Sequence, residues 1–150
     1  SKEKLPLTPE EYGKYYKICD ALPFAFTDIE MVFDKEKKAV DWIFRYGNEA
    51  LAALEKQPLD KMIGSSFSSL FSNMDSKWLQ GYERATLYGE TLEIMDYSPE
   101  IDTNLKIICF PTFPGHCGCI LFNADKMKSI SEENHLVRLV EVSMKNNSSK

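Results

Sequence analysis

The chain has 150 residues, 43% hydrophobic and 12% aromatic, a composition typical of one globular domain rather than a disordered segment. Its formal net charge of -5 argues against a nucleic-acid partner, which would call for a basic face. No apolar run approaches the roughly 18 residues of a membrane span, and the first residues lack the apolar segment of a signal peptide. We therefore expect a cytoplasmic protein.

The first predicted element is a helix over residues 8–20. Thr8 and Glu11 form a capping box, with Pro9 at the first helical position. The helix carries an apolar stripe of Tyr12, Tyr15, Tyr16 and Cys19. Two strands follow, residues 24–33 and 39–46, at the distance of a hairpin around the charged turn 34–38.

The second strand ends in a change of pattern. Trp42, Phe44 and Tyr46 alternate with Asp41, Ile43 and Arg45, which predicts that the three aromatic side chains share one face of the sheet. Asn48 then breaks the alternation and is predicted to cap a helix over 49–55. The alanines of this helix let it lie close to the sheet, so we expect a pocket between helices and sheet.

The remaining elements complete the fold prediction. Short helices are predicted over 59–63 and 67–71, and a longer one from Asp75 to Gly89. Three strands follow, 91–97, 104–112 and 117–124, the last two joined by a turn at 113–116. A terminal helix is predicted over 129–144. Two hairpins separated by helices predict an α+β fold, with an antiparallel sheet and helices on one face.

Four stretches, in this order, carry a resemblance to a known family. FRYGNEALAAL leads from a strand into an asparagine-capped helix, MIGSSFSSLF contains Gly-x-x-x-x-x-Leu-Phe, YGETLEIMDYSPE enters a strand, and KIICFPTFPGHCGCILFNAD forms a closing hairpin. Together they resemble the PAS domain, a sensory module of signalling proteins. The resemblance implies a single domain over 1–150 with a core of about 22–125. It also implies a five-stranded antiparallel sheet, short helices on one face and flanking helices at 8–20 and 129–144.

The resemblance also bears on cofactors and output. WLQGYERATLYGE is similar to modules attached to bacterial diguanylate cyclases or other signalling outputs, although Asn123-Ala124-Asp125 stands where many members have Asp-Ile-Thr. The flavin photosensor variant has a cysteine in the asparagine-led helix, and Asn48-Glu49-Ala50-Leu51 has none. Neither histidine lies in the helix cluster, where a haem ligand would be needed. We therefore expect neither haem nor a photoactive flavin, and the cofactor, if any, is unknown.

The cysteines and histidines admit a metal site as an alternative. Cys109, Cys117, Cys119 and His116 supply the right atoms, but His116 is expected in the turn, and zinc needs about four converging ligands. Free cysteine is commonly buried. We therefore predict reduced core cysteines and no metal, with His116 in a hairpin loop and His135 on a helix surface.

The resemblance implies a non-enzymatic module that binds an unknown small molecule, or merely dimerises, and biases a C-terminal output. We expect the pocket to be lined by Phe44, Tyr46, Asn48, Leu51, Leu54, Phe67, Phe71 and Trp78. A homodimer is expected to form through the stripes of the terminal helices, namely Tyr12, Tyr15, Tyr16, Leu136, Val137, Val140 and Met144. The alternative is that both helices cover their own sheet.

Two rival functions remain open. The first is a small α+β enzyme that uses the same pocket, with Glu93 or Asp96 as acid or base and Glu90 as a further candidate. The second is a ligand-free dimerisation scaffold. A pocket without a titratable group of shifted pKa would favour the sensory module over the enzyme.

Overall fold

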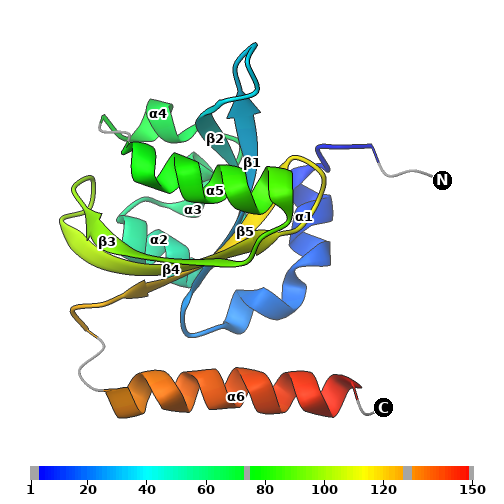
Figure 1. The fold of residues 1–150 in the computed structure, drawn as a ribbon. Coiled ribbons are helices and arrows are strands. Elements are labelled where there is room, and N and C mark those ends of the chain that lie inside the picture. Colours follow the sequence, from blue (N-terminus) through cyan, green and yellow to red (C-terminus); the bar gives the residue numbers. More distant parts are fainter. Residues whose placement is uncertain (1–3, 73–74, 127–129, 149–150) are drawn as a thin grey trace.

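The computed structural model describes residues 4–72, 75–126 and 130–148. At its centre is a five-stranded antiparallel sheet in the order β2-β1-β5-β4-β3 (Figure 1). The strands are β1 (Ala25–Phe33), β2 (Ala39–Gly47), β3 (Leu92–Ser98), β4 (Thr103–Pro111) and β5 (His116–Asn123). The first strand pairs with the last at the middle of the sheet, so residues from both ends of the core lie side by side.

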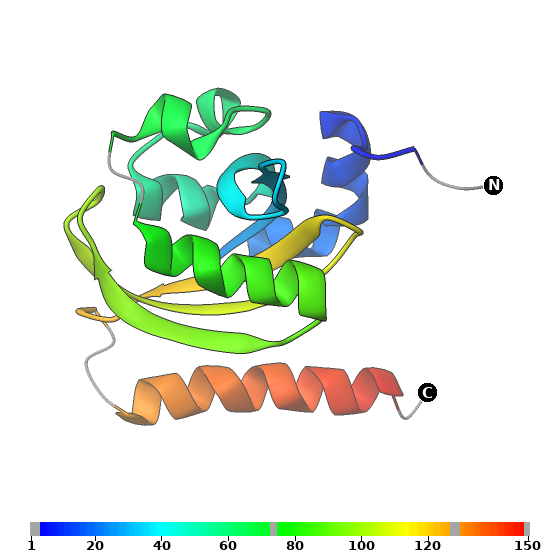
Figure 2. The same ribbon diagram turned by 45° about the horizontal axis from the view of Figure 1, so that its top comes forward.

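Helices lie on both sides of this sheet (Figures 1 and 2). The face that we call inner is covered by α2 (Glu49–Glu55), α3 (Leu59–Met62), α4 (Phe67–Leu70) and α5 (Ser76–Tyr88). Part of the opposite, outer face is covered by α1 (Pro9–Tyr15) and the short 3₁₀ helix η1 (Lys17–Ala21). The C-terminal α6 (Ile130–Ser148) runs apart from α2–α5, beyond the outer face.

The predicted α+β fold with its antiparallel sheet, short helices and flanking helices is confirmed. Local sequence signals set the element ends: Thr8 and Glu11 form the predicted capping box, and Gly89 ends α5 in a left-handed conformation with φ 67°. The predicted first helix is divided at Tyr16 into α1 and η1. The C-terminal helix extends beyond its predicted end at residue 144.

The inner core contains three of the four cysteines. Cys109, Cys117 and Cys119 are buried, and Cys109 pairs with Cys119 across β4 and β5. Burial raises the pKa of the Cys109 thiol to about 12, so this thiol is protonated and unreactive near neutral pH. Within the described ranges, no group of three or more His, Cys, Asp or Glu side chains is placed to hold a metal ion.

His116 corrects the prediction of a loop residue. It begins β5, is buried on the outer face, and lies 2.9 Å through Nε2 from the Tyr12 hydroxyl and 3.0 Å through Nδ1 from the Pro114 carbonyl oxygen. Because a carbonyl oxygen only accepts, Nδ1–H donates to Pro114, and Nε2 shares a hydrogen bond with the Tyr12 hydroxyl. The turn lies one residue earlier than predicted, at 112–115, and α1 covers its end. His135 is exposed on α6, as predicted.

A β-bulge in β2 corrects the prediction that Tyr46 shares a face with Trp42 and Phe44. Asp28 pairs with Tyr46 and Ile29 with Phe44, so Arg45 has no partner of its own in the register. The extra residue reverses the alternation. Trp42 and Phe44 therefore point into the inner core, whereas Tyr46 packs on the outer face.

The apolar stripe of the N-terminal helix packs against the sheet of its own chain. This corrects the prediction that Tyr12 and Tyr16 form a dimer face. Both side chains are buried among outer-face residues such as Phe26 and Tyr46. The Tyr16 hydroxyl donates a hydrogen bond to the Asp28 carboxyl group. Only Tyr15 of the predicted tyrosines is exposed. The outer face of the sheet is apolar enough to bind the stripe without a second subunit.

Replacing Tyr16 by Phe is expected to destabilise the protein by about 2 kcal/mol, because a buried carboxyl group loses its donor. Burial raises the pKa of Asp28 to about 6. Above that pH Asp28 is ionised and needs the donor most, so the loss should be larger at about pH 8 than at about pH 5. Urea unfolding at both pH values measures this difference. Tyr15→Phe, at an exposed neighbouring position, is the control, and an equal loss in both variants would contradict the assignment.

Candidate ligand-binding cavity

A small cavity lies between the inner face of the sheet and the helices. Its volume is about 10 Å³, about the space of one water-sized group. It is lined by Trp42, Glu55, Phe67, Trp78, Tyr82, Glu100, Leu105, Ile107 and Leu121. The aromatic walls pack against one another, with ring centroids 4.3 Å apart for Trp42 and Phe67 and 5.1 Å apart for Trp42 and Tyr82.

Glu55 gives this cavity its chemistry. It is the last residue of α2, four positions after the fully buried Leu51, and its own exposure is only 7%. Burial and then the nearby carboxylate of Glu100 raise the pKa of Glu55 to about 8. Near neutral pH the Glu55 carboxyl group is therefore largely protonated, and ionising it requires a compensating partner.

Several polar atoms at the cavity have no hydrogen-bond partner among the described residues. These atoms are Oε2 of Glu55, Oε2 of Glu100 and the indole nitrogens of Trp42 and Trp78. Buried polar atoms in proteins are almost always paired, with protein or with ordered water. The cavity thus offers two carboxyl groups and two indole N–H donors to a compact polar group.

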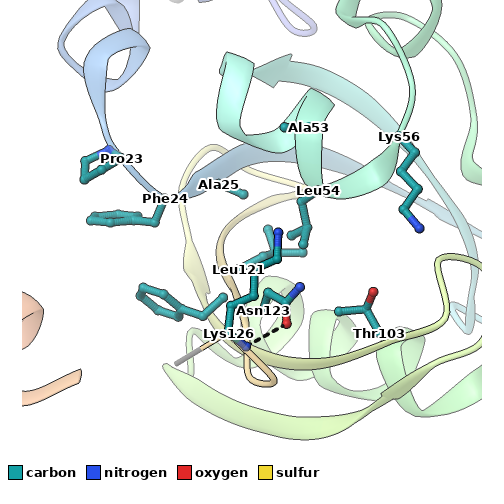
Figure 3. A pocket seen from close by; sticks show the side chains of 11 residues that line it. Pro23, Phe24, Ala25, Ala53, Leu54, Lys56, Thr103, Leu121, Asn123 and Lys126 are labelled. Carbon is teal, nitrogen blue, oxygen red and sulfur yellow. Dashed lines mark hydrogen bonds between the residues drawn. The ribbon is translucent and has the colours of Figure 1, made fainter. Parts of the chain in front are cut away.

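A wider groove of about 500 Å³ opens beside this cavity (Figure 3). Leu54 of α2 faces β5 across it, and Leu121 lines both the groove and the inner cavity. Lys126 lines the end of the groove, where the chain leaves towards α6. Its backbone N–H donates to the Asn123 side chain at 3.2 Å. The groove therefore connects the cavity wall with the exit of the chain.

The predicted pocket residues are distributed over several places. Phe67 and Trp78 line the inner cavity and Leu54 lines the groove. Phe44 and Leu51 are packed in the inner core, and Phe71 stacks on Phe67 at 4.7 Å. Of the predicted set, Phe44, Leu51 and Phe71 therefore line neither the inner cavity nor the groove. Tyr46 lies on the outer face because of the bulge in β2.

Asn48 caps α2 as predicted, its Oδ1 accepting from Leu51 N–H at 3.0 Å. The same oxygen accepts from Phe26 N–H at 3.1 Å, and Nδ2 donates to the carbonyl oxygens of Cys19 and Phe24, each at 3.0 Å. All four hydrogen-bonding positions of the amide are therefore used within the protein. This corrects the prediction that Asn48 contacts a ligand. Its side chain positions α2, and all of its hydrogen-bonding groups are already occupied.

The acid–base candidates Glu93 and Asp96 lie elsewhere. Both are exposed on β3, where Glu93 pairs with Lys106 at 3.5 Å and Asp96 with Lys77 at 3.3 Å. Glu90 pairs with Arg84 at 2.7 Å. The titratable group in the cavity is Glu55, which the sequence analysis did not single out. Its spacing of four from Leu51 was the available signal, because it places both on one helical face.

The remaining predicted residues lie on α6. Val137, Val140 and Met144 are exposed, whereas the side chain of Leu136 lies outside the described residues. Leu139 and Val142 add further exposed apolar surface. Across the described segments, no helix combines the length and apolarity that crossing a bilayer requires.

Comparisons with known proteins add little to these observations. A scan against protein-family models and a search of curated proteins both give no match. A solved structure of an RNA-binding Light-Oxygen-Voltage receptor is similar over 94% of this chain, with 15% sequence identity and a TM-score of 0.45. The chain spans 40% of the length of that receptor. The strand order and the helices of the chain itself define its architecture, a PAS-like α+β fold.

Proposed function

We propose that this chain is a sensory module that binds a small molecule between its helices and its sheet and passes a conformational bias through its C-terminal end. The observation that carries the proposal is the groove of about 500 Å³ beside α2, a volume typical of small-molecule sites, next to an inner cavity where Trp42, Trp78, Glu55 and Glu100 have unpaired polar atoms. Empty packing voids are apolar, whereas a polar cavity of this size holds a bound water or the polar end of a larger molecule.

A route for the signal is supported by the neighbouring groove. A ligand that moves Glu55 moves the end of α2, which carries Leu54 in the groove wall. The opposite wall includes Lys126, the last described residue before α6. Coupling of this kind requires that the groove wall has two conformations and that the ligand binds them with different affinity.

Native mass spectrometry of gently purified protein tests the proposal. We expect an additional mass that is lost on denaturation, and amide hydrogen exchange in α2 and residues 120–126 should slow when the released molecule is added back. Protein that retains no small molecule, and whose exchange is insensitive to a library of small metabolites, would contradict the proposal.

A second candidate is supported by the raised pKa of Glu55, which suits a general acid or base. In this function the chain is a small enzyme with Glu55, rather than Glu93 or Asp96, as its acid or base. Incubating the native protein with its co-purified molecule distinguishes the two. The sensory module returns the molecule with unchanged mass, whereas an enzyme converts it and Glu55→Gln abolishes the conversion.

We further propose that α6 contributes a homodimer contact, because Val137, Val140 and Met144 form an exposed apolar stripe. Light scattering should give a dimer for the full chain and a monomer for a version that ends at Lys126. Val140→Glu should also give the monomer, since it places a charge in the stripe. His135→Glu, which adds the same charge on the opposite face of α6, is the control. A monomeric full chain at high micromolar concentration contradicts this contact.

A further inference from the structure

The groove beside α2 carries positive charge in an acidic protein. The chain has 23 acidic and 18 basic residues, yet the residues that line this groove include Lys56 and Lys126 and no Asp or Glu. Both lysines are exposed, and neither side chain forms an ion pair with a carboxylate among the described residues. The groove therefore presents two ammonium groups that the described part of the chain does not neutralise.

The acidic neighbours of the two lysines are directed elsewhere. Glu55 precedes Lys56, but its carboxyl group lines the inner cavity, and its pKa of about 8 keeps it largely protonated near neutral pH. Asp125 precedes Lys126, and its carboxylate accepts hydrogen bonds from Asn104, at 3.0 Å from the side chain and 3.3 Å from the backbone N–H. Neither carboxyl group is part of the groove wall.

The uncharged polar groups of the groove add to its donors. Asn123 Oδ1 accepts from the backbone N–H of Asp125 at 3.0 Å and of Lys126 at 3.2 Å. Because a backbone N–H only donates, these bonds fix the orientation of the amide, and Nδ2 is left as a donor without a partner among the described residues. The Thr103 hydroxyl already donates to the Ile101 carbonyl oxygen at 2.9 Å. The groove therefore suits a ligand that brings negative charge and oxygen acceptors.

The rest of the lining is apolar. Leu54 of α2 and Leu121 of β5 lie on opposite walls (Figure 3). The rings of Phe24 and Phe122 extend the apolar surface, with centroids 5.4 Å apart, and both side chains are only half-buried. A hydrocarbon chain that covers these side chains removes apolar surface from water, which favours binding. The volume of about 500 Å³ leaves room for such a chain together with a charged head group.

We propose that the groove binds a small amphipathic carboxylate, with its hydrocarbon part against Leu54, Leu121 and Phe122 and its carboxylate at the rim that Lys56 and Lys126 provide. This inference rests on the proposed sensory function and names the ligand class for the groove. The carboxylate does not need to bridge both lysines, because an ammonium group acts on an anion over a Debye length of about 8 Å at physiological ionic strength. An ionised carboxylate only accepts hydrogen bonds, which matches a rim of donors.

Octanoate, octan-1-ol and octylamine form a matched series of probes, because they share the same length of hydrocarbon chain and differ in the charge of the head group. The experiment uses the full chain near neutral pH. Octanoate should give a saturable titration by calorimetry and raise the melting temperature. Octan-1-ol should bind about tenfold more weakly, and octylamine more weakly still. Acetate has the charge without the chain and should not bind measurably.

Lysine variants locate the head group. The Lys56→Gln, Lys126→Gln double variant should lower octanoate affinity by about tenfold or more and leave octan-1-ol affinity unchanged. Lys35→Gln is the control, because Lys35 is exposed in the turn after β1, at the opposite end of that strand from Ala25 in the groove wall. Octan-1-ol that binds as tightly as octanoate, or full octanoate affinity in the double variant, would overturn the inference.

A second pair of variants tests the groove itself. Ala53 is exposed on α2 and lines the groove. Ala53→Glu adds a negative charge there, whereas Ala53→Gln adds a side chain of nearly the same shape without charge, and both residues favour helices. Octanoate affinity should be about fivefold or more lower in Ala53→Glu than in Ala53→Gln, and the difference should shrink as salt is raised. Equal octanoate affinity in the two variants would place the carboxylate outside the groove and contradict the inference.

These data distinguish failure of the inference from failure of the sensory function. If native mass spectrometry recovers a bound molecule without an acidic group and octanoate does not bind, the carboxylate assignment is wrong and the sensory function stands. If octanoate binds as expected but leaves amide exchange in α2 and residues 120–126 unchanged, the ligand class stands and the proposed route of the signal fails. If no molecule is recovered and none of the probes binds, both proposals fail.

Discussion

Glu55→Gln is expected to raise the free energy of unfolding by about 4 kcal/mol at about pH 8, which is an unusual direction for a change in a core. The folded protein holds Glu55 protonated up to about pH 8, whereas the unfolded chain releases this proton near its ordinary pKa of 4.5. The contribution of Glu55 to the free energy of unfolding is therefore greatest below about pH 4.5 and falls as the pH rises towards 8. The amide side chain of the Glu55→Gln variant does not titrate, so its contribution stays constant over this range.

The pH dependence is the measurement that identifies the cause. Between about pH 5 and about pH 8 the stability of the native sequence should fall relative to that of Glu55→Gln, and the two should approach each other at the acidic end. Glu36→Gln, in the exposed turn between β1 and β2, is the control and should change stability by no more than about 0.5 kcal/mol at either pH. A pH-independent difference between Glu55→Gln and the native sequence would contradict a titrating Glu55.

Asn48→Ala is expected to destabilise the protein by about 3 kcal/mol or more, well above the roughly 1 kcal/mol of an ordinary helix cap. The variant leaves the N–H groups of Leu51 and Phe26 and the carbonyl oxygens of Cys19 and Phe24 without their partner. Three elements then lose a common anchor, because these groups belong to α2, β1 and the segment around η1. Chemical unfolding by circular dichroism measures the loss.

Two comparison variants separate capping from anchoring. Ser66 caps α4 by accepting from Ser69 N–H at 3.3 Å, and Ser66→Ala should cost about 1 kcal/mol. Asn48→Asp keeps the accepting oxygen but cannot donate to Cys19 and Phe24, so its cost should be substantial although the cap remains. If Asn48→Ala costs no more than Ser66→Ala, the bonds to η1 and β1 contribute little and Asn48 acts as a simple cap.

Local sequence determined most of the secondary structure. Alternation of apolar residues and charged turns placed the five strands, and Thr8, Asn48 and Gly89 marked helix ends that the structure retains. These signals are readable because caps and strand alternation depend on residues only a few positions apart. The same signals predicted the space between helices and sheet, with Phe67 and Trp78 at its wall.

The tertiary structure decided which side chains meet in that space. The bulge at Arg45 moved Tyr46 to the outer face, and the pairing of β1 with β5 brought His116 beneath Tyr12. Glu55 and Glu100 are separated by 45 positions and line one cavity only because the fold brings the end of α2 and the β3–β4 turn to the same space. The register of the strands, the bulges and the choice of helices that cover each face of the sheet depend on contacts between distant segments. For that reason the sequence by itself determined the elements and the class of fold, and the packing of those elements decided the chemistry of the site.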